Sequence, residues 1–168
     1  MPRGNSVDLA DADEQIEATA GKTIATIFKD EGEPGFRDRE AAALVDLCRR
    51  DRTIATGGGA VLRPANRELL RDAGFIVWLA TAATTSWERL QGDATTASRR
   101  PNLTASGGLE EVQSLIAART PIYRELSHFT INTDTESPEA VASAILTACN
   151  GGTPQSPASG ASGSSSSA

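Results

Sequence analysis

Branched and aromatic residues gather in four short apolar runs, and longer stretches with helical spacing separate them. The runs are Val7 to Ala10, Thr53 to Thr56, Phe75 to Leu79 and Phe129 to Asn132. Short apolar runs bounded by turn residues predict β-strands. Strands that alternate with helices predict an α/β fold in three layers, in which helices cover both faces of a mostly parallel sheet.

Helical periodicity fills the segments between the predicted strands. The clearest helix begins near Pro34, which suits a first turn. On one face it places Phe36, Ala41, Leu44, Val45 and Cys48. Further helices are predicted from Pro64 to Ala73 with Gly74 as the stop, from Leu109 to Leu126, and from Pro138 to Cys149 with Ser137 as the cap.

Composition divides the chain into one domain and a tail. Residues 1–150 suffice for a single core. Residues 151–168 are mostly Ser, Gly, Ala and Pro, which predicts a disordered tail. Between Gly92 and Gly108 the periodicity disappears, and a long irregular segment inside a compact domain is usually functional. We expect a lid at about 93–107 whose arginines bind anions, with a solvated basic turn as the alternative.

Charge and composition exclude several classes of protein. The net charge of −6 argues against a nucleic-acid partner. No apolar run reaches the roughly 20 residues that cross a bilayer, and the N-terminus lacks the apolar segment of a signal peptide, so we expect a cytoplasmic protein without membrane association. Cys48 and Cys149 are expected to be buried small hydrophobes. His128 is the single histidine, which excludes a metal site built on histidine.

Three consecutive glycines, Gly57, Gly58 and Gly59, directly follow the second apolar run. Glycine loses more conformational freedom on folding than other residues, so three in a row predict a tight turn or a close approach of backbone to a ligand. Ligands of open parallel sheets bind beyond the carboxyl ends of the strands. We therefore expect these glycines to line a ligand site, with a flexible surface turn as the alternative.

Two carboxylates, Asp11 and Asp13, stand at the end of the first predicted strand, just before a helix. At such a corner both side chains can face a ligand. One carboxylate could join a Mg²⁺ shell, directly or through water, and the other could accept a proton from a hydroxyl. Asp13 could equally cap the helix.

Three arginines in separate segments, Arg37, Arg100 and Arg119, are candidates for binding anions. A guanidinium group can hold a carboxylate or phosphate through two parallel hydrogen bonds. Each of the three could be a surface charge when taken singly. Their order along the chain, with the glycines after Arg37, favours a site for an anionic substrate and a transferring phosphoryl group.

Five segments taken together resemble the shikimate kinase family, in register over about residues 8–148. They are Asp11 to Glu17, Glu31 to Glu40, Thr56 to Val61, Arg100 to Leu103 and Arg119 to Tyr123. The resemblance implies a P-loop kinase fold of the nucleoside-monophosphate-kinase type. It also implies transfer of a phosphoryl group from ATP, with Mg²⁺, to the 3-hydroxyl of shikimate in chorismate and aromatic amino acid biosynthesis, by an enzyme that we expect to be a monomer.

The resemblance also implies roles on the substrate side. Asp11 would lie near the Mg²⁺ shell, and Asp13 would bind the ring hydroxyls of shikimate and act as the base. Arg37 and Arg119 would hold the shikimate carboxylate. The backbone of the three glycines would lie against the substrate.

On the nucleotide side, the resemblance implies that Arg100 reaches the ATP phosphates from the lid and takes part in catalysis. Arg89 matches a second arginine near the nucleotide. The family usually reads Arg-Pro-Leu-Leu where this chain has Arg100-Pro101-Asn102-Leu103, a departure that keeps the arginine.

One motif of the family does not occur in the 168 residues. Such kinases begin with a strand followed by G-x-x-x-x-G-K-[ST], whose backbone N–H groups cradle the phosphates. Gly21-Lys22-Thr23 matches only its end, because Ile16 stands where the first glycine is needed. Gly21 is expected to end a helix and Thr23 to cap the next. The resemblance therefore implies a sheet that lacks its central first strand.

Two explanations of the missing motif remain open. The chain is N-terminally truncated, or it is a paralogue that has lost ATP chemistry and keeps a binding role. The first is favoured because every substrate-side motif is present. We expect the chain as given to be inactive, with a catalytically dead shikimate-binding protein, or another small-molecule kinase such as gluconate kinase, as the alternatives.

Overall fold

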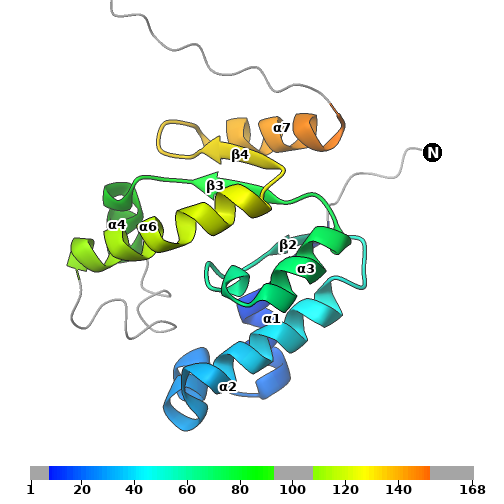
Figure 1. The fold of residues 1–168 in the computed structure, drawn as a ribbon, viewed down its shortest axis with the longest axis vertical. Helices are drawn as coiled ribbons and strands as arrows, with labels where there is room; N and C mark the ends of the chain where they lie inside the picture. Colours follow the sequence, from blue (N-terminus) through cyan, green and yellow to red (C-terminus); the bar gives the residue numbers. More distant parts are fainter. Residues whose placement is uncertain (1–7, 93–107, 152–168) are drawn as a thin grey trace, which may run out of the picture.

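The computed structural model of the protein describes residues 8–92 and 108–151. The predicted lid at about 93–107, with Arg100, lies outside the described residues, as does the tail beyond Gly151. Strands and helices alternate along the described chain (Figure 1). The elements are β1 (Leu9–Asp11), α1 (Ala12–Ala20), α2 (Ile24–Leu47), β2 (Thr53–Ala55), the 3-10 helix η1 (Ala60–Leu62), α3 (Pro64–Ala73), β3 (Val77–Ala80), α4 (Ala83–Gly92), α6 (Gly108–Leu126), β4 (Phe129–Asn132) and α7 (Pro138–Cys149).

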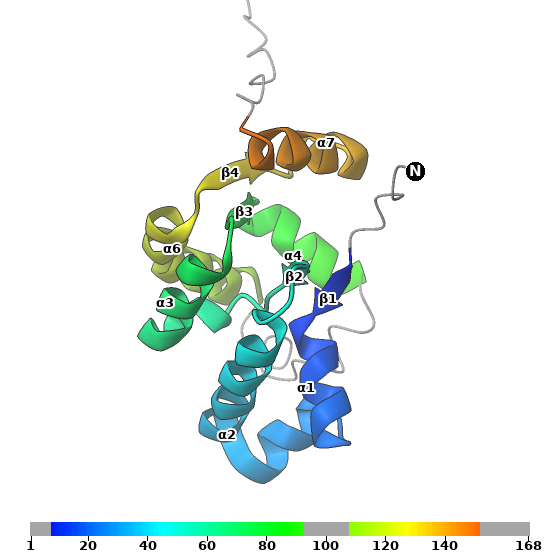
Figure 2. The same ribbon diagram turned by 90° about the vertical axis from the view of Figure 1, so that its right-hand side faces the viewer.

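The described strands form two separate two-stranded parallel sheets. β1 pairs with β2, with Asp11 opposite Ala55, and β3 pairs with β4, with Ala80 opposite Asn132. Figure 2 shows β1 and β2 side by side. In Figure 1, α1, α2 and α3 lie with β2 in one half, and α4, α6 and α7 lie with β3 and β4 in the other. The prediction of parallel strands with helices is confirmed, and the strands fall into two pairs instead of one continuous sheet.

The main described core lies between α1 and α2. Its members are Ile16, Ile24, Ile27, Phe36 and Ala43, each at most 7% exposed. Phe28 packs against this cluster and stacks on Phe36, with ring centroids 4.7 Å apart. Burying one large apolar side chain stabilises a fold by about 1.5–3 kcal/mol, so this cluster supplies much of the stability of its half.

The helix ends follow the local signals of the sequence. Gly21 ends α1 with a φ of 65°, and the Thr23 side chain accepts a hydrogen bond from the Thr26 N–H at the start of α2. The Ser137 side chain accepts one from the Ala140 N–H at the start of α7. α3 runs from Pro64 to Ala73, as predicted. Among the described helices, none has the length and apolar character needed to span a bilayer.

α2 consists of two helical segments that meet at Gly32, whose φ of 69° and ψ of −175° are not helical. Pro34 falls in the first turn after this bend, where its missing N–H removes no helical hydrogen bond. Across the bend, the Glu31 carboxylate binds the Arg39 guanidinium and the Lys22 ammonium, both at 2.8 Å. The Arg39 hydrogen bonds, followed by that of Lys22, lower the pKa of Glu31 to about 2.

The two cysteines, expected to be buried, are not: Cys149 is exposed and Cys48 is half-buried. Val45, expected on the same apolar face as Phe36 and Leu44, is 41% exposed. The buried face of α2 contains Glu40 together with Leu44 and Leu47. Because the charged Glu40 is part of the buried face, the apolar residues alone predicted a face that wrongly included Val45.

We expect Gly32→Ala to lower the free energy of unfolding by about 1–3 kcal/mol, because the backbone at this residue lies in a region that only glycine adopts readily. A β-carbon there would meet only ordinary contact, 3.5 Å from Pro34 Cδ, so the effect would come from the backbone. Urea denaturation measures it. Gly92→Ala is the control, because Gly92 is helical with open space around it. Equal stability of both variants would contradict the prediction.

Candidate functional site

The glycine segment 57–59 connects β2 to η1 in a tight turn. The Ala60 N–H donates to the Gly57 carbonyl at 3.0 Å, and the Leu62 N–H donates to the Gly59 carbonyl at 3.0 Å. None of these three glycines is among the described glycines with positive φ. A left-handed backbone therefore does not explain why glycine is needed here.

Close approach of side chains explains the glycines better. A β-carbon on Gly59 would lie 2.7 Å from Arg37 Cζ, and one on Gly58 would lie 3.1 Å from the Tyr123 hydroxyl and 3.5 Å from Arg119 Nη1. Arg37 belongs to α2, whereas Arg119 and Tyr123 belong to α6. The structure thus brings the two predicted carboxylate-binding arginines to the same two glycines from opposite halves of the molecule.

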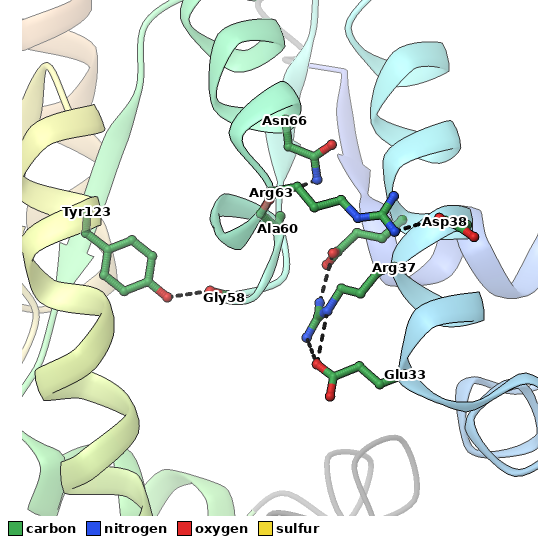
Figure 3. A network of polar contacts seen from close by, with 9 residues as sticks. Glu33, Arg37, Asp38, Gly58, Ala60, Arg63, Asn66 and Tyr123 are labelled. Carbon is green, nitrogen blue, oxygen red and sulfur yellow. Dashed lines mark hydrogen bonds and ion pairs between the residues drawn. The ribbon is translucent and has the colours of Figure 1, made fainter.

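Polar side chains hold η1 and the start of α3 in place behind the glycines. The side chain of Asn66, which is 3% exposed, donates to the Ala60 carbonyl at 2.9 Å. The Arg67 guanidinium donates to the Val61 carbonyl at 2.7 Å, and the Arg63 guanidinium binds Asp38 of α2 at 2.6 Å. Figure 3 shows how these contacts of Asn66 and Arg63 surround the turn. α3 and α2 thereby fix the position of the glycine segment.

Two carboxylates of different burial hold Arg37. Its Nη1 donates to Glu40 at 2.8 Å, and its Nη2 binds Glu33 at 3.2 Å (Figure 3). The Glu40 side chain is 2% exposed and that of Glu33 is 63% exposed. Arg37 also lies over the ring of Phe36, with Cζ 5.1 Å from the ring centroid. Glu40 is therefore a fixed support of the guanidinium, whereas Glu33 can give way to an anionic ligand.

Tyr123 joins α6 to the glycine segment. Its hydroxyl donates to the Gly58 carbonyl at 2.6 Å, and Figure 3 shows the ring reaching from its helix to the turn. The same ring contacts Trp78 of β3, with centroids 5.7 Å apart. Arg119 stands four residues earlier, so both side chains leave the same face of the helix.

Asp11 and Asp13 occupy the predicted strand-to-helix corner. Oδ1 of Asp11 accepts hydrogen bonds from the N–H groups of Asp13 at 2.8 Å and Glu14 at 3.2 Å, so Asp11 caps α1. The alternative that Asp13 is the cap is therefore wrong. Because Asp11 lies opposite Ala55 in a parallel pair, this corner and the glycine segment both follow the carboxyl ends of adjacent strands.

Arg89 lies on α4 and binds the end of β4. Its guanidinium donates to the Thr133 carbonyl at 2.7 Å and to the Thr133 hydroxyl at 3.1 Å. Nearby, Asp134 accepts hydrogen bonds from the Thr81 hydroxyl and the Ala82 N–H, which lower its pKa. Arg89 thus stands beyond the carboxyl ends of β3 and β4 and is not brought to the glycine segment by any contact among the described residues.

A Mg²⁺ ion would find limited protein ligands in the described part of the chain, where no group of three His, Cys, Asp or Glu residues is placed to hold a metal. Mg²⁺ often takes only one or two carboxylates and fills its shell with water and phosphate oxygens. Asp11 fits such a site, because its Oδ2 takes no part in the cap of α1.

Glu40 and Tyr123 are the supporting residues to which sequence reasoning gave no role. Glu40 follows Arg37 by three residues and Tyr123 follows Arg119 by four. These spacings place each pair on one helix face, which is the signal that could have identified them.

We expect Glu40→Gln to lower the free energy of unfolding by about 3 kcal/mol, because it removes the buried partner of the Arg37 charge and leaves only the exposed Glu33 among the described residues. Glu33→Gln is a matched control, with the same substitution beside the same guanidinium. It should cost less than about 1 kcal/mol, because the Glu33 side chain is mostly exposed to solvent. Urea denaturation compares the two, and equal losses would contradict the different roles given to them.

Comparison with known proteins adds an independent observation. The family model described as shikimate kinase matches residues 3–150. A shikimate kinase from Rhodopirellula baltica is 45% identical over 144 residues, which cover 85% of this chain and 77% of that protein. One from Symbiobacterium thermophilum is 44% identical over 139 residues, covering 82% and 79%.

A solved structure, shikimate kinase from Acinetobacter baumannii in complex with shikimate, is similar with a TM-score of 0.79 and 35% sequence identity. The match covers 86% of this chain and 79% of that one. The family model, the related sequences and the solved structure all point to the same family. The chain belongs to the shikimate kinase family.

Proposed function

We propose that this chain forms the shikimate-binding part of a kinase that phosphorylates the 3-hydroxyl of shikimate with ATP and Mg²⁺. The observation that carries the proposal is the convergence of Arg37 and Arg119 on Gly58 and Gly59. Two guanidinium groups beside bare backbone form a site for a carboxylate, which shikimate carries on its ring. Gluconate also carries a carboxylate, so the preference for shikimate over gluconate rests on the family to which the chain belongs.

The carboxylate of shikimate would take the place of Glu33 on Arg37. Glu33 holds the guanidinium from an exposed position, where an ion pair contributes only about 0–1 kcal/mol. Glu40 would remain bound to Nη1 and keep the guanidinium plane oriented. An incoming carboxylate with two fixed cationic partners therefore competes well with a mobile side chain.

The reacting hydroxyl would be placed toward the Asp-x-Asp corner. We propose that Asp13 binds ring hydroxyls of shikimate and accepts the proton, and that Asp11 contributes to the Mg²⁺ shell. A metal ion there would neutralise negative charge on the phosphates. Arg89 and Arg100 are proposed to act on the nucleotide side, with Arg100 also supporting catalysis.

Shikimate binding and phosphate transfer depend on different parts of the protein. The 168 residues contain no G-x-x-x-x-G-K-[ST] segment, whose lysine and hydroxyl serve the γ-phosphate and Mg²⁺. We therefore propose that these residues bind shikimate without transferring phosphate at a useful rate.

We expect Arg119→Ala to weaken shikimate binding roughly 10- to 100-fold, because it removes a hydrogen bond between charged groups, and to leave any ATP binding much less affected. Isothermal titration calorimetry measures both ligands. Arg124→Ala is the control, with the same loss of charge on the same helix at an exposed position. An equal loss in both variants, or no shikimate binding by the unaltered chain, would refute the proposed site.

We further expect no shikimate-dependent release of ADP from the 168-residue chain in a coupled assay. Fusion of a strand and phosphate loop from an active shikimate kinase ahead of residue 8 should restore turnover. The same fusion with the loop lysine replaced by methionine should remain inactive, because that lysine binds the transferring phosphate. Turnover by the unfused chain would overturn the proposal that binding and transfer are separated here.

A further inference from the structure

Tyr123, which is not one of the predicted binding groups, contacts the glycine segment. Its hydroxyl donates to the Gly58 carbonyl at 2.6 Å across 65 residues of sequence. The ring is half-buried and is held from the side by Trp78 of β3. A short hydrogen bond from a supported ring restricts the orientation of the carbonyl that accepts it.

Fixing the Gly58 carbonyl also fixes the next amide. A trans peptide unit is planar, so its C=O and N–H groups point in opposite directions. The described residues contain no cis peptide bond. Because Tyr123 holds the Gly58 carbonyl toward α6, the N–H of Gly59 points away from the Tyr123 hydroxyl. Orientation of this N–H is therefore set by a side chain that does not touch it.

The two arginines flank the same peptide unit. Arg119 Nη1 lies 3.5 Å from the place of a β-carbon on Gly58, and the Arg37 guanidinium lies against the equivalent place on Gly59. Among the backbone hydrogen bonds between described residues in turns and loops, none uses the Gly59 N–H, whereas the Gly59 carbonyl accepts from the Leu62 N–H. An oriented amide between two cations is well suited to a carboxylate.

We propose that Tyr123 is a positioning residue for carboxylate recognition: its hydroxyl holds the Gly58–Gly59 peptide so that the Gly59 N–H, Arg37 and Arg119 bind the substrate carboxylate together. The proposal rests on the proposed function, because it takes shikimate as the ligand. Tyr123 itself does not contact the substrate in this arrangement. A purely structural role, in which Tyr123 only ties α6 to η1, would weaken every ligand of the site alike.

Two ligands separate these roles. Shikimate carries the carboxylate, and the analogue in which –CH₂OH replaces it keeps the ring hydroxyls. For Tyr123→Phe we expect a roughly 3- to 10-fold loss of shikimate affinity, the size of one lost hydrogen bond, and little change for the alcohol. The preference for carboxylate over alcohol should fall by the same factor. Calorimetric titration of each protein with each ligand measures that preference.

Thr120→Val is the matched control. It removes a hydroxyl from the adjacent position of α6, where the Thr120 side chain donates to the Ile116 carbonyl within the helix. We expect its carboxylate preference to equal that of the unaltered chain. A Tyr123→Phe protein with unchanged preference, or with equal losses for both ligands, would overturn the role of Tyr123 while leaving shikimate binding intact. Absence of shikimate binding by the unaltered chain would instead overturn the proposed function, and this inference with it.

A second replacement tests the role of the Tyr123 hydroxyl if the Tyr123→Phe protein does not fold. Tyr123 is the single tyrosine of the chain, so biosynthetic incorporation of 3-fluorotyrosine changes this ring alone. The fluorine makes the phenol a stronger donor while the ring and hydroxyl remain. We expect the carboxylate preference to be kept or raised, and its loss would contradict the proposal.

Discussion

The missing β-carbons of Gly58 and Gly59 are the constraint on which the arrangement of the site depends. Any larger residue at Gly59 would overlap the Arg37 guanidinium, and one at Gly58 would press on the Tyr123 hydroxyl. The two halves of the described molecule contain separate sheets, so contacts at this turn help to set their relative position. Glycine serves here by leaving room for other side chains, with no need for an unusual backbone angle.

The two ion pairs of Arg37 show how a guanidinium can be held on one side and remain accessible on the other. A guanidinium buried with no partner would be strongly destabilising, whereas one saturated by buried carboxylates could not bind a substrate. Glu40 satisfies one side from the interior and Glu33 satisfies the other from solvent. The free energy needed to expose the second side is small because the Glu33 pair is screened by water. A carboxylate ligand can thus displace Glu33 without unfolding α2.

The described strands form two separate sheets, and the groups proposed for binding differ from those needed for catalysis. Parallel strands expose unpaired N–H and C=O groups along any free edge, and such edges favour pairing with a further strand. The groups proposed to bind a carboxylate come from α2, α6 and the glycine segment between β2 and η1. Phosphate transfer needs a preorganised cradle of donors, which belongs to a motif that the 168 residues do not contain.

Local chemistry in the sequence was enough to determine most elements and their ends. Helices begin or end where predicted at Pro64, Gly74 and Ser137. Gly21 ends a helix and Thr23 caps the next one, as expected. These ends were predictable because caps and turns depend on the residue at the position itself. The resemblance to the family also singled out Arg37, Arg119 and the glycines, which the structure brings together. Their roles toward a ligand remain proposals.

Only the tertiary structure decided which groups support that site. The buried face of α2 includes the charged Glu40 and leaves Val45 exposed. A pattern of apolar residues cannot predict that a charged residue is buried. The bond from Tyr123 to Gly58 spans 65 residues and exists because α6 packs against η1. The pairing of strands into two sheets is equally non-local. Sequence alone determines local conformation and chemical type, whereas contacts between distant segments depend on how whole elements pack.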